Sequence, residues 1–413
     1  MNVAGFRLAA RSPAAPLTVA DWRERARRRL PDMVWAYLEN GADGERTLRD
    51  NRTALDAWAL RQRVLSGVVD PDLTTTVAGT ELALPVLGAP MGLLGAAHWH
   101  GDLGVARAAE RRGTRLVLSS ASTYSIEEVA EQTRQSHWFQ LYPWGDRELT
   151  GTLVRRAEDA GYGALVVTVD VPVLGNRLGE QRRGMAMPPT LSPARVSHAL
   201  TRPRWCYGYA RHRRTTLRNL QPPGTRGAVR SVAAQSARLG GRLDWDDLDW
   251  LRAQWSGPLL VKGVLEPEDA ERCVELGADG IVVSNHGGRQ LDGAPAAIEA
   301  LPAVVDQVGS RAEVLVDGGI RTGLDVIVAL ALGARACLVG RPLAYGLAGG
   351  GTHGAADVLR ILRDELRRGL TLMGLSSAAQ LDRSSIRLRG TPAARPTVGS
   401  AAPILNGAAT EAS

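Results

Sequence analysis

Short apolar runs rich in β-branched residues recur along the chain and alternate with longer segments of helical periodicity. Eight of these runs have the pattern of buried strands: Leu82–Pro90, Thr114–Ser120, His137–Tyr142, Ala164–Asp170, Pro258–Gly263, Gly280–Asn285, Glu313–Gly319 and Ala336–Arg341. Helical segments between them, such as Asp102–Gly113, Thr150–Gly161 and Glu266–Gly277, end in glycine, as helix C-termini commonly do. Continuously apolar strands that alternate with helices favour a parallel sheet covered by helices. Eight repeats predict an α/β fold, a closed (β/α)8 TIM barrel.

The segments outside this repeat define the expected domain organisation. Amphipathic helices are predicted over Val19–Asn51 with a break at Pro31, so the barrel should carry an N-terminal helical extension. We expect one barrel domain over 18–388, a flexible tail over 1–17 and a disordered Ala/Pro/Ser-rich tail over 389–413. A loop of about 70 residues follows the fourth strand, and loops of this length are usually functional lids or partly disordered.

The composition favours a soluble globular protein. Hydrophobic residues make up 44% and charged residues 23% of the chain. There is no run of about 18 apolar residues that could span a membrane and no secretion signal, so we expect a cytoplasmic protein. Cys206, Cys273 and Cys337 lack metal-ligand spacing and are odd in number. They predict reduced packing thiols and no metal site.

Charge is concentrated in the long loop. The net charge is +7, yet Pro189–Arg230 carries nine arginines and no acidic residue. One interpretation is a solvated, arginine-rich lid. The other begins from Trp205, Tyr207 and Tyr209, which are interleaved with arginines, a pattern suited to the headgroup region of an anionic membrane. Nucleic acid is not an expected partner, because the barrel offers no base-reading element.

A single lysine stands out in this arginine-rich chain. Lys262 ends the strand "PLLVK", whereas all the other basic residues are arginine. Arginine therefore serves the general surface role, and a lone lysine at a strand end indicates a task that needs a compact ammonium group. Chance retention of one lysine on the surface is the alternative.

Polar residues gather at the C-terminal ends of the predicted strands, where barrel enzymes place their active sites. They are Gln140, Tyr142, Thr168, Asp170, Lys262, His286, Arg289, Asp317, Arg321, Gly340 and Arg341. His286 has the titration range of a general base. Arg289, together with Arg177 from the long loop, could clamp a carboxylate, because guanidinium groups match carboxylate oxygens. Such a mouth could bind an anion and move a proton.

The last two predicted strands end in the glycine-rich turns "DGGIR" and "GRP". Barrel enzymes often hold a phosphate on the backbone N–H groups of these turns. A glycine there can also serve only to turn the strand tightly. Two such turns on neighbouring strands, each with an arginine, favour a ligand that carries phosphate.

Six motifs together make the pattern specific. They are "FQLY", "LVKG", "SNHGGRQLDG", "VDGGIRTGLDV", "ALALGA" and "LVGRP", in this order along the chain. From about Val19 to Leu388 the chain resembles the FMN-dependent L-2-hydroxy acid oxidases and dehydrogenases, a family that includes glycolate oxidase, lactate oxidase and mandelate dehydrogenase. The resemblance implies that FMN is the cofactor and that a 2-hydroxy acid is oxidised to the 2-oxo acid.

On the substrate side, the resemblance implies a role for each matching residue. His286 would take a proton from the substrate, and Asp170 would steady the resulting imidazolium. Arg177 and Arg289 would hold the substrate carboxylate. The residues expected to hydrogen-bond the substrate oxygens are Tyr37 and Tyr142.

On the flavin side, the resemblance places Lys262 beside N1 and the C2 carbonyl, where its ammonium would stabilise charge on the reduced ring. That position would explain the single lysine. The flavin site would consist of Pro90, Met91, Gly92, Ser119, Gln140, Thr168, Lys262, Ser284, Asp317, Gly318, Gly319, Arg321, Gly340 and Arg341.

Three sequence features resemble the membrane-associated mandelate and lactate dehydrogenases of the family: Gly92, the small Ala121, and "RPRW" in the long loop. The expected electron acceptor is a membrane quinone or oxygen, with the quinone favoured if the long loop contacts a membrane, and the family resemblance implies a homotetramer. Two features depart from the family. After Arg177 the chain reads "LGE" where a basic–acidic pair is usual, and Met91 stands where a smaller or β-branched residue is commoner.

Two other functions are compatible with a phosphate-binding barrel. A type 2 isopentenyl-diphosphate isomerase also uses FMN, but its substrate would not require His286, Arg289 and Arg177 to converge on a carboxylate. A barrel that has lost catalysis could serve as a binding protein, although it need not retain His286, Asp170 and Lys262 together.

Overall fold

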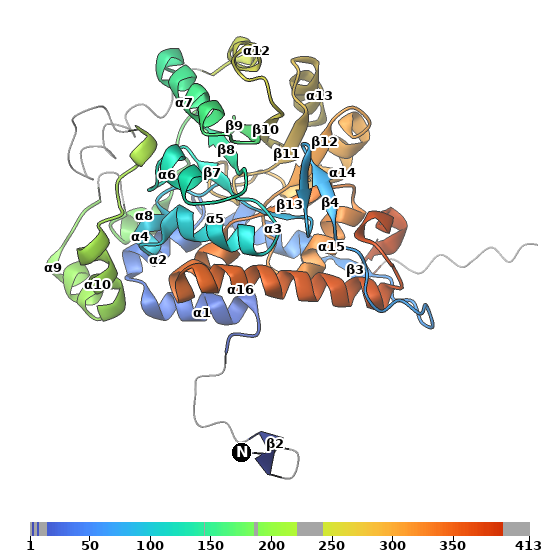
Figure 1. Cartoon of the computed structure of the whole chain (residues 1–413), viewed down its shortest axis with the longest axis horizontal. Helices are drawn as coiled ribbons and strands as arrows, with labels where there is room; N and C mark the ends of the chain where they lie inside the picture. The colour runs from blue at the N-terminus through green and yellow to red at the C-terminus, as the bar shows by residue number, and fades with distance from the viewer. Residues whose placement is uncertain are drawn as a thin grey trace, which may run out of the picture.

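Eight parallel strands form a closed barrel at the centre of the molecule (Figure 1). They are β6 (Val86–Gly88), β7 (Val117–Ser119), β8 (Trp138–Leu141), β9 (Ala164–Thr168), β10 (Leu259–Val264), β11 (Gly280–Val283), β12 (Glu313–Val316) and β13 (Ala336–Val339). β6 pairs with β13, and a parallel bridge between Gly88 and Leu116 closes the ring. Seven of these strands lie within predicted runs, and β10 extends one residue beyond its run, to Val264, so the predicted TIM barrel is confirmed. The computed structural model describes residues 15–143, 145–185, 189–220 and 243–390, and only the backbone of 2–3 and 6–7.

Helices surround the barrel on its outside. They are α4 (Leu94–Ala97), α5 (Gly101–Arg111), α6 (Ile126–Glu131), α7 (Arg147–Asp159), α12 (Trp245–Gln254), α13 (Pro267–Glu275), α14 (Ala297–Val308), α15 (Gly323–Ala331) and α16 (Arg341–Met373). Gly113, Gly161 and Gly277 follow helices in the left-handed conformation, with φ of 68°, 76° and 89°. This confirms their predicted role in ending helices.

The predicted N-terminal extension consists of α1 (Val19–Arg29), α2 (Asp32–Glu39) and α3 (Arg46–Asp56). Pro31 separates the first two helices, as expected. α1 runs along α16 (Figure 1) and buries Trp22, whose indole donates to Asp357. α2 carries Tyr37 toward the C-terminal ends of the barrel strands.

Three short antiparallel pairs were not predicted. β1 (Asn2–Val3) pairs with β2 (Phe6–Arg7), β3 (Trp58–Leu60) with β14 (Ile386–Leu388), and β4 (Thr75–Val77) with β5 (Thr80–Leu82). The β4–β5 hairpin buries Val77 and Leu82 against the residues that fill the barrel interior. Trp138, at the start of β8, donates its indole hydrogen to Thr80 of the hairpin. The hairpin therefore covers the N-terminal end of the barrel, and the C-terminal end remains for a site.

The long segment after β9 contains α8 (Leu178–Arg182), α9 (Pro193–Leu200), α10 (Pro203–His212) and the 3-10 turn η1 (Arg218–Leu220). In its described part it is therefore largely helical rather than an irregular loop. Residues 186–188 and 221–242 lie outside the described residues, as does the predicted C-terminal tail from 391 onward. None of the described helices is long and apolar enough to cross a membrane. The three cysteines are free thiols, as predicted.

Candidate active site

A cavity opens at the C-terminal end of the barrel. Sixteen of the residues predicted for the site line it: Tyr37, Pro90, Met91, Gly92, Tyr142, Thr168, Arg177, Lys262, His286, Arg289, Asp317, Gly318, Gly319, Arg321, Gly340 and Arg341. Asp170 and Ser284 stand directly behind this wall and hydrogen-bond to residues in it, and Ser119 donates to Gln140 at 3.0 Å. Residues from the N-terminal helices, from the ends of seven barrel strands (β6 and β8 to β13) and from the long segment thus line one cavity.

The backbone after β11 explains the "HGG" motif. His286, Gly287 and Gly288 are all left-handed, with φ of 58°, 66° and 73°. Such a conformation is costly for histidine and free for glycine. A side chain at Gly288 would come within 2.6 Å of the Leu48 backbone. The two glycines therefore allow a tight turn, and the strained histidine points its ring into the cavity.

His286 is held between a carboxylate and a phenol. Its Nδ1 lies 2.9 Å from Oδ1 of Asp170, and its Nε2 lies 3.3 Å from the Tyr142 hydroxyl. Because Asp170 accepts the Nδ1 proton, Nε2 carries the lone pair. Burial lowers the pKa of His286 below its ordinary value of 6.5, although Asp170 opposes this effect. The imidazole is therefore neutral at neutral pH and can accept a proton at Nε2.

The Asp170 carboxylate stays ionised in this buried position. Burial by itself would raise its pKa, but the interactions with His286 and then Lys262 outweigh burial and lower it. A side chain at Gly263 would come within 2.6 Å of the Asp170 side chain, so this glycine leaves room for the carboxylate. A negative charge beside Nδ1 stabilises the imidazolium that forms when Nε2 accepts a proton.

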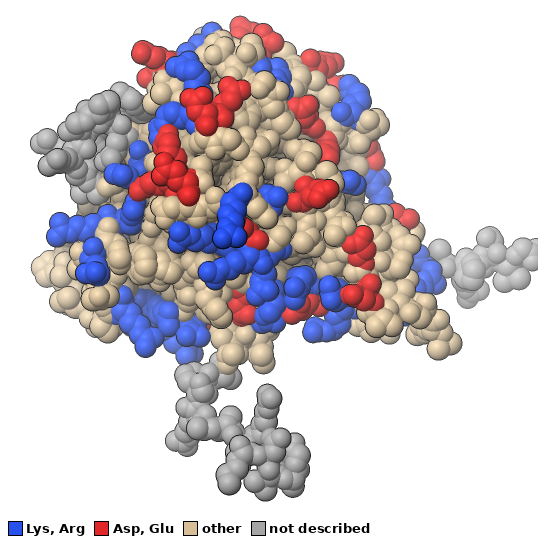
Figure 2. Space-filling view, in the orientation of Figure 1, with Lys and Arg blue, Asp and Glu red and all other residues tan. Residues whose placement is uncertain are grey.

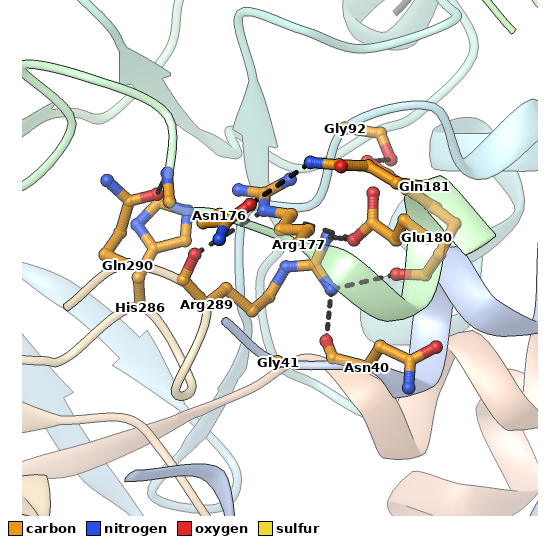
Figure 3. Close-up of polar contacts among 12 residues, drawn as sticks. Asn40, Gly41, Gly92, Asn176, Arg177, Glu180, Gln181, His286, Arg289 and Gln290 are labelled. Atoms are coloured by element: carbon orange, nitrogen blue, oxygen red, sulfur yellow. Dashed lines mark hydrogen bonds and ion pairs between the residues drawn. The ribbon is translucent and has the colours of Figure 1, made fainter. Parts of the chain in front are cut away.

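The two predicted arginines lie side by side in the cavity wall (Figure 3). Arg289 donates to the carbonyls of Tyr37 and Asn40 at 2.9 and 2.8 Å, and to the carboxylate of Glu180 at 2.8 Å. Nε of Arg177 lies 3.5 Å from the Arg289 carbonyl and 4.0 Å from Glu180. Burial and then the charge of Arg289 lower the pKa of Arg177. A carboxylate ligand between the two guanidinium groups would offset that repulsion.

Lys262 lies at the base of the cavity with only 3% of its surface exposed. Its ammonium donates to Ser284 at 2.7 Å and pairs with Asp317 at 2.9 Å. The only lysine of the chain is thus a buried site residue rather than a surface residue. The surface alternative is wrong.

The ends of β12 and β13 form a second, cationic half of the cavity. The guanidinium of Arg341 donates hydrogen bonds to the backbone carbonyls of Leu38, Gly287 and Asn40. Burial, Arg289 and Arg321 lower its pKa to about 10. Among the described residues no carboxylate forms an ion pair with Arg341. The N-terminus of α16, at Gly340, adds its helix dipole, so this half suits a phosphate dianion.

The residues present fit FMN. Within the described part of the chain, four buried polar atoms in or directly behind the cavity wall have no hydrogen-bond partner: Nε2 of Gln140, Oγ1 of Thr168, Oδ2 of Asp170 and Oδ1 of Asp317. Buried polar atoms rarely lack hydrogen-bond partners in folded proteins. These atoms therefore indicate that a polar ligand supplies the missing hydrogen bonds. A flavin ring has hydrogen-bonding edges, and its ribityl phosphate matches the cationic half. No cluster in the described ranges could hold a metal ion.

Sequence reasoning missed several residues in or directly behind the cavity wall. Glu180 was noticed only as a departure from the family pattern, and the structure pairs it with Arg289. Val171, Leu174 and Leu217 come from the segment after β9 and line the same cavity as Ala121, although no motif marks them. Only the three-dimensional path of that segment brings them there.

A TIM barrel with this site has the architecture of a flavin-dependent oxidoreductase. The family model described as "FMN-dependent dehydrogenase" matches residues 26–388 of this chain. An L-lactate oxidase of Nostoc sp. is 43% identical over 379 residues, which cover 91% of this chain and 99% of that protein. An L-lactate dehydrogenase of Caulobacter sp. is also 43% identical, covering 89% of this chain and 97% of that protein.

A comparison with solved structures points to the same family. The crystal structure of the monotopic membrane protein (S)-mandelate dehydrogenase superimposes with a TM-score of 0.87 and 39% identity, covering 90% of this chain and 99% of that chain. The chain belongs to the family of FMN-dependent 2-hydroxy acid oxidases and dehydrogenases. It is an enzyme that uses FMN to oxidise a 2-hydroxy acid to the 2-oxo acid. The isomerase and non-catalytic alternatives are not favoured.

Proposed function

We propose that this enzyme oxidises L-2-hydroxy acids with apolar or aryl side chains, and that His286 is its base. The convergence of the Asp170–His286 pair and the Arg177–Arg289 pair on one cavity carries the proposal. Bound FMN supplies the acceptor for the two electrons that leave the substrate α-carbon. Nε2 of His286 takes the proton, and Asp170 balances the charge that develops on the imidazolium.

Each remaining predicted residue has a proposed task. Arg177 and Arg289 bind the substrate carboxylate, and Tyr142 and Tyr37 orient its oxygens. Lys262 stabilises negative charge near flavin N1. Ring contacts come from Pro90, Met91, Gly92, Ser119, Gln140, Thr168 and Ser284, whereas ribityl and phosphate contacts come from Asp317, Gly318, Gly319, Arg321, Gly340 and Arg341.

The space for the substrate side chain supports the aryl preference. A Cβ at Gly92 would lie 3.2 Å from the Cβ of Ala121, so these two small residues adjoin. Leu174 and Leu217 line the same cavity. Small residues together with apolar ones in one cavity suit a bulky apolar group, which gains free energy from leaving water.

We expect wild-type protein to bleach its flavin anaerobically with mandelate at least as fast as with glycolate. In Ala121→Trp the indole would fill the space beside Gly92 and Tyr37, so the preference for mandelate over glycolate should fall about tenfold or more. Stopped-flow reduction with both acids measures the ratio. A wild-type preference for glycolate that Ala121→Trp leaves unchanged would show that position 121 does not set substrate size.

We further propose that α9 and α10 rest on an anionic membrane surface and that a membrane quinone is the electron acceptor. Leu191, Leu200 and Tyr207 are about 70% exposed, at 71%, 67% and 69%. Such exposure of large apolar side chains in one segment is typical of an interaction surface. The similar L-lactate oxidase and L-lactate dehydrogenase are equally identical to this chain, so identity alone does not decide the acceptor.

Arginines from a second element adjoin this surface. Arg29 of α1 and Arg204 of α10 line a cavity whose other walls include Trp99, Tyr207 and Tyr209. Burial, Arg25 and Arg204 lower the pKa of Arg29. Basic side chains gather at the lower left of Figure 2, where Figure 1 places α1 and α10. Aromatic and apolar groups beside clustered arginines suit an anionic lipid surface.

Wild-type protein should therefore sediment with anionic vesicles at low salt and less so at high salt, because the Debye length shortens. Replacing Leu200 and Tyr207 together by serine should reduce binding, whereas Leu324→Ser, on an exposed site of α15, should not. Reoxidation of reduced flavin in air-saturated buffer should be slow. If vesicles fail to bind at either salt concentration and peroxide forms quickly, the protein is a soluble oxidase and the arginines belong to an ordinary lid.

We also propose a homotetramer. Val64, Leu65 and Val69 are 76%, 102% and 84% exposed in the loop between β3 and β4, away from α9 and α10. Three exposed apolar residues in one loop suit a contact with a second copy of the chain. Light scattering should give four times the chain mass for wild-type protein and a smaller mass when the three residues become serine. A monomeric wild-type protein would contradict the proposal.

A further inference from the structure

Glu180 places a buried carboxylate directly behind the arginine pair. Only 5% of its surface is exposed, and Oε1 lies 2.8 Å from Nη2 of Arg289 and 4.0 Å from Nε of Arg177 (Figure 3). A carboxylate in such a position is stable only because it is paired with a cation. The predicted roles of the site assign no function to Glu180.

The local sequence "LGE" is what brings this carboxylate to Arg289. At Gly179 a Cβ would come within 2.5 Å of the Asn40 side chain, so α8 can lie this close to the end of α2 only with glycine there. Asn40 in turn accepts a hydrogen bond from Arg289 through its carbonyl oxygen at 2.8 Å. The carbonyls of Tyr37 and Asn40 accept from one guanidinium nitrogen and Glu180 accepts from the other, so the group is held in place at both ends of its fork.

Charge counting gives Glu180 a second effect. Arg177 and Arg289 contribute two positive charges to the carboxylate site, and Glu180 removes one. Of the other carboxylates nearby, Asp317 pairs with Lys262, and Asp170 lies on the Nδ1 side of His286, where it faces the imidazole rather than the arginine pair. Arg177, Arg289 and Glu180 together therefore present a net charge of about +1, which matches the charge of a single substrate carboxylate.

We propose that Glu180 is a positioning and specificity-determining residue that tunes the arginine pair to monocarboxylic 2-hydroxy acids and discriminates against dicarboxylic ones. The inference rests on the proposed role of Arg177 and Arg289 in binding the carboxylate. An added unit of positive charge a few ångströms away acts about twice as strongly on a dianion as on a monoanion. Removing the charge of Glu180 should therefore strengthen the binding of a dianion more than the binding of a monoanion.

Oxamate and oxalate test this directly, because they have nearly the same shape and neither is oxidised. At neutral pH oxamate is a monoanion and oxalate a dianion. Each can be titrated into the FMN-loaded enzyme, with the change in flavin absorbance giving Kd. In Glu180→Gln the Kd ratio of oxamate to oxalate should rise about tenfold, since the amide keeps one acceptor oxygen but loses the charge.

Two variants separate charge from geometry. Glu180→Asp keeps the charge on a shorter side chain, so both ligands should bind more weakly while their ratio stays within about twofold of wild type. Glu127→Gln breaks another arginine pair, with Arg156 at 2.7 Å, outside the cavity. It should change neither constant.

The outcomes are distinct. An unchanged ratio in Glu180→Gln, with either weakened or unaltered binding of both ligands, overturns the proposal and leaves Glu180 a structural residue. A changed ratio in Glu180→Asp overturns it as well, and that result is available even if Glu180→Gln fails to retain FMN. If Arg177→Leu leaves both constants at their wild-type values, the carboxylate clamp itself is wrong and the proposed function of the arginines fails instead.

Discussion

His286→Gln should keep the fold and the bound flavin yet reduce the flavin with 2-hydroxy acid at least 10²- to 10⁴-fold more slowly, about the usual contribution of a general base. The amide can still approach Tyr142 and Asp170, the two partners of the imidazole at 3.3 and 2.9 Å. It has no lone pair basic enough to take the substrate proton. Anaerobic stopped-flow reduction isolates this step from reoxidation.

The pH dependence provides an independent signature of the same base. Because the His286 pKa is lowered below 6.5, the reactive neutral form persists down to that lowered pKa. The wild-type kcat/KM should therefore be flat near neutrality and should fall about tenfold per pH unit only below the lowered pKa of His286. The residual activity of His286→Gln should lack this acid limb.

The control is His353→Gln, an exposed histidine on α16, which should retain the wild-type rate and profile. A rate for His286→Gln within tenfold of wild type, with the acid limb intact, would remove His286 from the role of base. Loss of bound flavin in the same variant would point to a structural effect, and the absorption spectrum would detect it.

The strands were predictable because parallel barrel strands are buried on both faces and are therefore continuously apolar. The long helix α16 was not predictable in this way. Its sequence contains Gly349, Gly350 and Gly351, and glycine disfavours a helix interior. In the structure a Cβ at Gly349 or Gly350 would lie 2.8 Å from the Trp22 ring. These glycines serve the packing of α1 on α16, and Gly351, with φ of 62°, forms the kink.

The strand-end residues of the site were predictable for a similar reason, since the fold dictates where the C-terminal ends of the strands meet. Lys262 and His286 could be assigned to the site from their positions in the sequence alone, because each lies at the end of a predicted strand. Leu217 and Glu180 belong to the segment after β9, whose return to the barrel mouth depends on tertiary contacts such as α8 against Asn40. No local pattern encodes such a path.

Arg341→Ala should weaken FMN binding about 10- to 100-fold, because a charge-assisted contact to phosphate contributes about 1.5–3 kcal/mol. Arg341 is the buried cation at the β13 end of the cavity, and its pKa is lowered to about 10 by burial, Arg289 and Arg321. That repulsion costs free energy in the protein without ligand, and a phosphate dianion relieves it. Titration of the apoprotein with FMN, followed by fluorescence quenching, measures the change.

Arg341 also bonds three backbone carbonyls, so part of the loss could arise from the turn at Gly287. Arg341→Lys separates the two effects: it keeps the charge but loses the fork of hydrogen bonds, and should fall between wild type and alanine. Riboflavin, which lacks the phosphate, should bind wild type and Arg341→Ala with similar affinity. Equal weakening of riboflavin and FMN binding would show that Arg341 supports the turn rather than the phosphate.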